Sequence, residues 1–145
     1  MKKAFLLTVV VMSMFSLTSC EKEILLAQSD IPSEITAYVT KHFPKHTIVQ
    51  AIKDKDGTEL TYDIILSDNV RLEFNRKKEI IDISSHTELP DSVIPEKILS
   101  YVRANYSDNY IKDWEIDDKK PQTVELDNKL ELVFDLSGNF LRLGD

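Results

Sequence analysis

Hydrophobic residues recur at helical spacing in two parts of the chain. Ile31, Ile35 and Val39 fall on one side of a helix that ends near Pro44. The same spacing begins again at Ile94, so we expect a second helix with the same buried side there.

Each expected helix is followed by segments in which apolar and polar residues alternate. A change of period from about 3.6 to about 2 is typical of antiparallel strands with one covered and one wet face. We therefore expect four strands after each helix, the first at about 47–53 and 110–117. The predicted fold class is α+β, with all strands in one curved sheet, both helices on one face and the other face open to water.

The sequence contains an internal repeat. Two stretches occur twice with small changes: Ile31–Val39 returns as Ile94–Val102, and Val70–Phe74 returns as Leu130–Phe134. We place repeat one at about 30–87 and repeat two at about 91–145, each burying its apolar face together with its twin. Gly138 stands where repeat one has Lys78, so we expect the last turns of the two repeats to differ in backbone type.

The first 19 residues have the features of a bacterial export signal. Lys2 and Lys3 precede an apolar stretch that is too short to span a bilayer. Leu17-Thr18-Ser19-Cys20 resembles a lipobox, with the one cysteine of the chain at the cleavage point. We predict a signal peptide at 1–19, lipidation of Cys20, a lipidated tether at 20–29 and a folded domain at 30–145.

An ordinary signal peptide with a stray cysteine is the alternative to a lipobox. Lipidation explains the sequence better, because it removes a lone thiol that has no partner for a disulfide. Two or three acyl chains would anchor the protein stably without spanning the membrane. Glu21 rather than aspartate follows Cys20, which favours the outer membrane, on its periplasmic face or at the cell surface.

Composition limits the classes of partner. The net charge is -7, and it becomes -9 once Lys2 and Lys3 are removed with the signal peptide. An acidic chain without a basic cluster argues against nucleic acid and against anionic lipid as partners. The chain has only three glycines, which argues against glycine-rich phosphate loops, and we expect no cofactor.

This combination resembles the PepSY-like, beta-lactamase-inhibitor-like domains of exported Bacteroidetes lipoproteins. The resemblance covers 31–143 and rests on the Ile-Pro start of each helix, on Trp114 and on the closing strand at 134–143. Repeat one departs from it, with Ala51 in place of the tryptophan. The resemblance implies a concave sheet face that grips a protein, as in the beta-lactamase inhibitors, or a domain that restrains a peptidase. No catalytic residue belongs to the family, so it implies that the protein is not an enzyme.

Other candidate sites carry less weight. His42 and His46 have the spacing of a helical metal pair, but Pro44 lies between them and no third ligand is in view, so we predict no metal site. No serine lies in a Gly-x-Ser-x-Gly motif, and Cys20 is consumed by lipid. The segment 54–59 is similar to a calcium loop but lacks its length and distal glutamate, so we interpret it as a hairpin.

Four aromatic residues lie at helical and strand spacing: Tyr38, Tyr101, Tyr106 and Trp114. They could line a ligand cradle, but this spacing favours a place in the core, with the polar tips at its edge.

The open sheet face is the candidate contact surface for a protein. The contact residues that we predict are Asp63, Ile65, Arg71, Glu73, Val133 and Asp135, and Asn75 and Glu131 lie on the same face. Ile65 and Val133 are apolar among charges, which fits a mixed contact surface, although scattered exposed apolar residues are common. We expect a non-catalytic envelope lipoprotein that binds an unidentified envelope protein. Inhibition or restraint of an envelope enzyme is the sharper form of this expectation. The alternatives are an accessory subunit of an envelope complex and a small-ligand-binding module.

Overall fold

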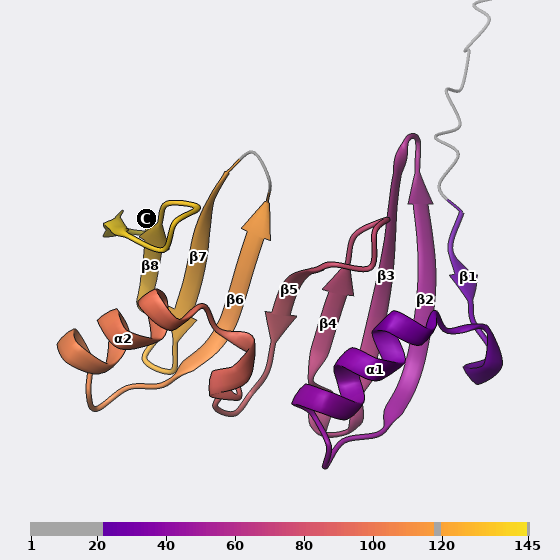
Figure 1. Ribbon diagram of the computed structural model, residues 1–145, viewed down its shortest axis with the longest axis horizontal. Helices are drawn as coiled ribbons and strands as arrows, with labels where there is room; N and C mark the ends of the chain where they lie inside the picture. The colour runs from indigo at the N-terminus through magenta and orange to yellow at the C-terminus, as the bar shows by residue number, and fades with distance from the viewer. Residues whose placement is uncertain (1–21, 118–119, 145) are drawn as a thin grey trace, which may run out of the picture.

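The computed structural model describes residues 22–117 and 120–144, so the predicted signal peptide and Cys20 lie outside the described residues. The first half of the described chain contains β1 (Ile24–Leu25), η1 (Gln28–Asp30), α1 (Ser33–His42), β2 (Ile48–Asp56), β3 (Glu59–Leu66), η2 (Ser67–Asn69), β4 (Arg71–Phe74) and β5 (Ile80–Ser84) (Figure 1). The second half contains η3 (Asp91–Val93), α2 (Glu96–Asn105), β6 (Ile111–Asp117), β7 (Lys120–Leu126), β8 (Glu131–Phe134) and β9 (Phe140–Leu143).

The nine strands of the described chain form one antiparallel sheet in which neighbours in space are neighbours in sequence. This confirms the predicted α+β class. The last strand of repeat one, β5, pairs with the first strand of repeat two, β6, and Ile83 lies opposite Trp114 at this junction. The order of one helix followed by four strands in each half is consistent with a duplicated unit.

Strand β1 was not predicted and lies within the segment interpreted as a tether. It pairs with β2 at the edge of the sheet, with Ile24 opposite Lys53. The amide of Leu26 also donates a hydrogen bond to the carbonyl of Ala51 at 2.9 Å. Part of the predicted tether is therefore an edge strand of the fold.

The two helices are built alike. Each begins directly after a proline, Pro32 or Pro95, whose missing N–H is no loss at a helix start. Each ends with the amide of an aromatic residue donating to a carbonyl four positions earlier. These bonds run from Phe43 to Val39 at 2.8 Å and from Tyr106 to Val102 at 2.7 Å.

The helices pack against the buried aromatic residues of the sheet. Figure 1 shows α1 crossing in front of β3 and β4, and α2 crossing in front of β7 and β8. The ring of Tyr38 meets Phe74 edge-on at 5.3 Å, and Tyr101 meets Phe134 in the same way at 5.4 Å. The buried side of the sheet, which we call the apolar face, carries Tyr62, Ile64, Leu72, Phe74, Ile83, Trp114, Val124, Leu132 and Phe134.

The four aromatic residues predicted as core do belong to it. Trp114 is buried, and the three tyrosines are partly buried against the same hydrophobic cluster. Burial raises the pKa of Tyr38 to about 12, because the ionised phenolate would lose its hydration. The Trp114 indole donates to the Gln122 side chain at 3.1 Å, and the Gln122 amide donates to the carbonyl of Asp135 at 3.0 Å. These two bonds satisfy the side chain of Gln122, a polar residue that is only 2% exposed.

The expectation that the last turns of the repeats differ in backbone type is wrong. Lys78 and Gly138 both have positive φ, at 65° and 79°. Their amides donate to Asn75 and Asp135 carbonyls respectively, both at 2.9 Å. The two turns are therefore the same, and repeat one places a lysine where glycine is the unstrained choice.

Candidate protein-binding face

The sheet face opposite the apolar face carries a continuous cross-strand row of side chains. Each member lies directly opposite the next: Leu25, Ile52, Asp63, Glu73, Asp82, Glu115, Thr123, Val133 and Arg142. The four consecutive acidic members come from β3, β4, β5 and β6. We call Asp63, Glu73, Asp82 and Glu115 the carboxylate ladder.

A second cross-strand row runs beside the first, two residues away from it on each strand. Its members are Gln50, Ile65, Arg71, Ser84, Asp113, Glu125 and Glu131. This row includes the positive charge of Arg71, and beside it the Lys112 ammonium meets the Glu125 carboxylate at 2.7 Å. In the described sheet, no basic residue lies directly opposite a ladder carboxylate.

The ladder is electrostatically unfavourable as it stands. Burial, and then repulsion from Asp113, Glu73, Glu115 and Asp63, raises the pKa of Asp82 to about 7. Burial is also the main reason that the pKa values of Asp63 and Glu73 are raised, with neighbouring carboxylates adding to it. Like charges directly opposite one another destabilise a sheet. The face would therefore gain from any positively charged group that approaches it.

Asp113, in the second row, belongs to the same electrostatic system. Burial and repulsion from Glu125 and Glu115 raise its pKa to about 6, against a smaller opposing effect of Lys112. The ionised forms of Asp82 and Asp113 are therefore both disfavoured by burial and by the neighbouring carboxylates.

A groove of about 660 Å³ lies along the ladder, lined by residues of β3, β4, β5 and β6 and of the turns next to them. Its lining includes the ladder residues Glu73, Asp82 and Glu115. It also includes the apolar side chains of Leu60, Ile81 and Ile116, and the basic side chain of Arg76, whose guanidinium donates to the Thr58 carbonyl at 2.7 Å. A long basic side chain suits such a lining, because its hydrocarbon stem lies on apolar surface while its charged end meets a carboxylate.

One further acidic residue on this side is incompletely paired. Among the described residues, Asp54 Oδ1 is the buried side-chain atom that lacks a hydrogen-bond partner. Asp54 lies opposite Thr61 next to the groove, and its charge contributes to the raised pKa of Asp63. A buried acceptor without a donor is costly, so this oxygen also favours an incoming donor.

Four of the six predicted contact residues lie where they were expected. Asp63 lies opposite Glu73, and Ile65 lies opposite Arg71, all four on the face that carries the ladder. Glu131, also assigned to this face, ends the second row. Asp63, Ile65, Arg71 and Glu73 all come from repeat one, and Glu131 comes from repeat two.

The other two predicted contact residues, Val133 and Asp135, are held by the fold itself. Val133 is on the row but is only 3% exposed, so it offers almost no surface to a partner. The Asp135 carboxylate accepts hydrogen bonds from the amides of Ser137 and Asn139 at 2.9 and 2.8 Å and from the Asn139 side chain at 2.8 Å. These bonds lower its pKa and hold the β8–β9 turn, as Asn75 holds the β4–β5 turn.

Sequence reasoning missed several acidic residues of this face, among them Asp82, Asp113 and Glu115. The signal for them was present, because each alternates with an apolar neighbour that points into the core, such as Ile83 or Trp114. The first strand of repeat one does not alternate cleanly, since Ile48, Val49, Ala51 and Ile52 are all apolar, so its facing does not follow from the sequence. The register of β5 against β6 was needed to bring the two repeats into one ladder.

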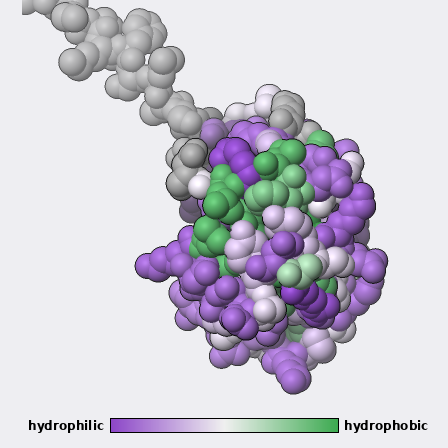
Figure 2. All heavy atoms as spheres, turned by 90° about the vertical axis from the view of Figure 1, so that its left-hand side faces the viewer, coloured by the Kyte–Doolittle hydropathy of each residue, from purple (hydrophilic) through white to green (hydrophobic). Residues whose placement is uncertain are grey.

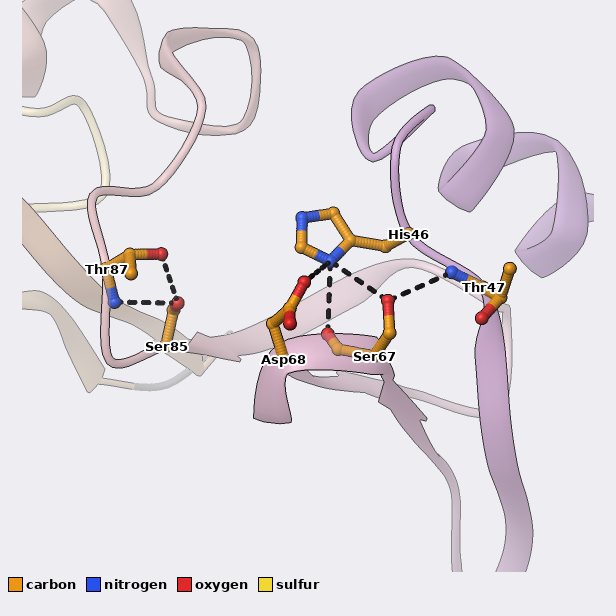
Figure 3. A network of polar contacts seen from close by, with 6 residues as sticks. All are labelled: His46, Thr47, Ser67, Asp68, Ser85 and Thr87. Carbon is orange, nitrogen blue, oxygen red and sulfur yellow. Dashed lines mark hydrogen bonds and ion pairs between the residues drawn. The ribbon is translucent and has the colours of Figure 1, made fainter.

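The two histidines make separate local contacts. His42 Nδ1 lies 2.9 Å from the Ser92 hydroxyl and so connects α1 with η3 of repeat two. Figure 3 shows His46 over the η2 turn, with Nδ1 3.0 Å from the Ser67 carbonyl and 3.5 Å from the Asp68 carboxylate. Both positions are explained by connections between loops. The segment 54–59 is a β2–β3 hairpin, with Asp56 opposite Glu59, as predicted.

Comparison with known proteins identifies the family. The model of the family described as "Putative beta-lactamase-inhibitor-like, PepSY-like" matches residues 16–82 and again residues 60–142. The chain belongs to this family. The predicted resemblance is therefore confirmed, and the PepSY-like model matches two overlapping regions that together span nearly the whole folded domain. None of the curated proteins matches the chain.

Solved structures of similar proteins come from Bacteroides. One from Bacteroides thetaiotaomicron, described as a "putative calcium-regulated periplasmic protein", is 27% identical, with a TM-score of 0.79 over 85% of this chain and 97% of that chain. One from Bacteroides vulgatus, described as a periplasmic protein of unknown function, is 30% identical, with a TM-score of 0.79 over 86% and 100% of the two chains. A DUF2874 protein from the same species is 26% identical, with a TM-score of 0.78 over 85% and 97%.

These relatives support an exported, envelope location for this PepSY-like protein, since all three are described as periplasmic. Within the part of the chain that the structure describes, neither helix is long and apolar enough to cross a membrane.

Proposed function

We propose that this PepSY-like protein is a non-catalytic envelope lipoprotein that binds a positively charged segment of a protein partner on its carboxylate ladder. In this proposal the helices cover only the apolar face, and Cys20 carries the lipid that anchors the protein in the outer membrane. The observation that carries the proposal is the run of four directly opposed carboxylates, none with a basic residue opposite it in the described sheet.

A protein segment suits this surface better than a small ion. The groove combines Glu73, Asp82 and Glu115 with Leu60, Ile81 and Ile116, so it offers both charge and apolar contact. Lysine and arginine side chains use both kinds of contact at once. Binding would also relieve the repulsion within the ladder, so part of the binding free energy would come from the partner's charge.

The partner is either an enzyme that the protein inhibits or restrains, or a complex in which it is an accessory subunit. Inhibition is the sharper form of the proposal and follows from the family resemblance alone, which does not establish function. An inhibitor would bind as a purified monomer and lower the rate of the enzyme. An accessory subunit would remain in a stable assembly without that effect.

Calcium binding is a second candidate. It is favoured by the ladder itself, because carboxylate oxygens are the ligands that Ca²⁺ prefers, and by the relative described as calcium-regulated. Against it, no three acidic, histidine or cysteine side chains of the described residues are arranged to hold a metal ion. A calcium ion would therefore require the ladder side chains to rearrange.

A matched pair of variants tests the proposal. The ladder variant is Glu73→Gln, Asp82→Asn and Glu115→Gln. The control removes the same number of charges from exposed positions elsewhere, with Glu88→Gln, Glu96→Gln and Asp108→Asn. Both are made in residues 20–145 with Cys20→Ser, immobilised and exposed to envelope extract of the source cell at low and high salt.

The expected result is a partner that the wild-type and control proteins retain, that the ladder variant loses, and that high salt weakens. The rate of the captured enzyme, measured with and without the protein, then separates an inhibitor from a subunit. A partner that the ladder variant binds as well as the control does would overturn the proposal. Calorimetric titration with CaCl₂ alone tests the second candidate, which predicts heat that the ladder variant abolishes.

A further inference from the structure

Strand β9 of repeat two is built like strand β5 of repeat one. Both follow the same turn and pair with the preceding strand through a bulge at the same place, next to Phe74 or Phe134. The matching pairs are Phe74 with Ile80 and Phe134 with Phe140, Glu73 with Asp82 and Val133 with Arg142, and Leu72 with Ile83 and Leu132 with Leu143. Arg142 thus corresponds to Asp82, and Leu143 corresponds to Ile83.

The two equivalent strands differ in what lies on their outer side. Strand β5 is covered there by β6, which places Trp114 opposite Ile83, and Ile83 is 0% exposed. Strand β9 is the last strand of the described sheet, and its Leu143 is 47% exposed. In the described sheet, no strand covers β9 in the way that β6 covers β5.

The β9 edge is also apolar at other positions. Leu141 is 53% exposed and Leu136, in the preceding turn, is 56% exposed. Figure 2 shows hydrophobic residues gathered on this end of the molecule, the left-hand side of Figure 1. An edge strand presents backbone donors and acceptors to another strand, and an apolar edge is a ready template for one. At β9 the Leu143 carbonyl accepts a hydrogen bond from the Arg142 guanidinium at 3.0 Å, so an added strand would compete for that acceptor.

We propose that β9 binds an extended segment of a partner protein as an added antiparallel strand, in the way that β5 holds β6. This site is separate from the carboxylate ladder and does not depend on the proposed function. Strand addition of this kind takes its affinity from main-chain hydrogen bonds and its specificity from alternate side chains.

The β5–β6 register predicts which side chains the partner strand would carry. Trp114 lies opposite Ile83, and Glu115 lies opposite Asp82. At β9 the same register sets a large apolar residue opposite Leu143 and the next residue opposite Arg142. Arg142 of β9 corresponds to Asp82 of β5, so an acidic residue of the partner strand opposite Arg142 would form a favourable pair of opposite charges. The Glu115–Asp82 pair in the protein itself is instead a pair of like charges. The partner strand therefore carries a large apolar residue followed by an acidic one.

A second copy of the chain suits this edge less well. If two β9 strands paired so that Leu143 of each met Leu141 of the other, the same register would set Arg142 opposite Arg142. Like charges directly opposite one another are destabilising.

The sequence of β6 itself has the required pattern and supplies the probe. A labelled peptide with the sequence Ile111–Asp117 is titrated into residues 20–145 with Cys20→Ser, and binding is followed by fluorescence anisotropy and by backbone amide NMR. The control peptide exchanges Trp114 and Glu115, which keeps the composition but puts each side chain on the wrong face.

We expect the β6 peptide to bind and to shift the amide signals of β8 and β9, and the control peptide to bind more weakly. Arg142→Glu in the protein should weaken binding about two- to fivefold, and Glu115→Lys in the peptide should restore it. The circular dichroism spectrum and urea midpoint of Arg142→Glu show whether that variant is folded. If Arg142→Glu is not folded, the same test is made with the wild-type protein and the peptide bearing Glu115→Lys. We then expect this peptide to bind more weakly than the unchanged β6 peptide.

Three results would overturn the proposal. The first is that the β6 and control peptides bind equally well, or that neither of them binds. The second is a set of shifts in β5 and β7, which would mean that the peptide replaces the protein's own β6. The third is concentration-dependent dimerisation in sedimentation that the peptide does not reduce, which would identify a second copy as the occupant.

Discussion

Replacing Asp82 by asparagine should make the protein more stable at neutral pH. Asp82 lies opposite Glu73 on one side and Glu115 on the other. Burial and the surrounding carboxylates raise its pKa to about 7, so its ionised form is disfavoured in the fold. Asparagine has nearly the same shape and no charge, and it therefore removes the repulsion without leaving a cavity.

The size of the effect follows from the pKa. A rise from the ordinary value of 3.8 to about 7 corresponds to about 4 kcal/mol at full strength. The side chain is only partly buried, and solvent screening reduces this to ~1–2 kcal/mol. Between these two pKa values the folded protein keeps a proton that the unfolded chain has released. The free energy of unfolding therefore falls as the pH rises from about 4 to about 7, and this group changes it no further above that.

Urea unfolding of the wild type, Asp82→Asn and the exposed control Asp108→Asn, from about pH 4.5 to about pH 8, measures this directly. We expect Asp82→Asn to be the more stable protein by ~1–2 kcal/mol at pH 8, with the difference shrinking towards pH 4.5. Asp108→Asn should follow the wild type throughout. The reasoning is refuted if Asp82→Asn is no more stable at pH 8, or if its advantage does not depend on pH.

Three further changes test the packing and the turns. Gln122→Ala should lower the free energy of unfolding by ~1–3 kcal/mol, because the buried Trp114 indole loses its acceptor at 3.1 Å; a near-UV circular dichroism change should accompany it. Gly138→Ala should lower the free energy of unfolding in urea by about 1–2 kcal/mol, and by more than Gly57→Ala does. Both glycines have positive φ, but only a Cβ at Gly138 would meet α2, at 3.1 Å from Lys97. Lys78→Gly should raise the thermal midpoint, because it relieves positive φ at the matching turn by up to ~1 kcal/mol.

The element types could be predicted because they depend on local spacing. Ile35 and Val39 face the core at helical spacing, and Leu72 and Phe74 face it at strand spacing, so the period alone identifies each. The turn containing Lys78 could not be predicted, because a lysine gives no sign of positive φ. The Asn75 side chain holds that turn instead, by accepting the amides two and four positions later.

The candidate face could be predicted only in part, since it depends on pairing between distant strands. Asp63 and Glu73 lie on strands joined by a short turn, so their alternation was sufficient to place them. Asp82 and Glu115 belong to different repeats, and only the β5–β6 register brings them together. Val133 was assigned correctly to the face by alternation, but its 3% exposure depends on its neighbours, which the period does not describe. Strand β1 is too short for any periodicity to reveal.

Comparison of the repeats indicates that the ladder is not a by-product of duplication. On the apolar face the equivalent positions keep their character, as with Leu72 and Leu132 or Phe74 and Phe134. On the ladder row they do not: Ile52, Asp63, Glu73 and Asp82 of repeat one correspond to Glu115, Thr123, Val133 and Arg142 of repeat two. Packing explains why the first set is constrained, whereas nothing in the fold requires acids to stand opposite one another. The ladder is an acidic patch that spans the junction between the repeats, with three members from repeat one and one from repeat two. It weakens the fold at a place where a partner's positive charge would offset the repulsion.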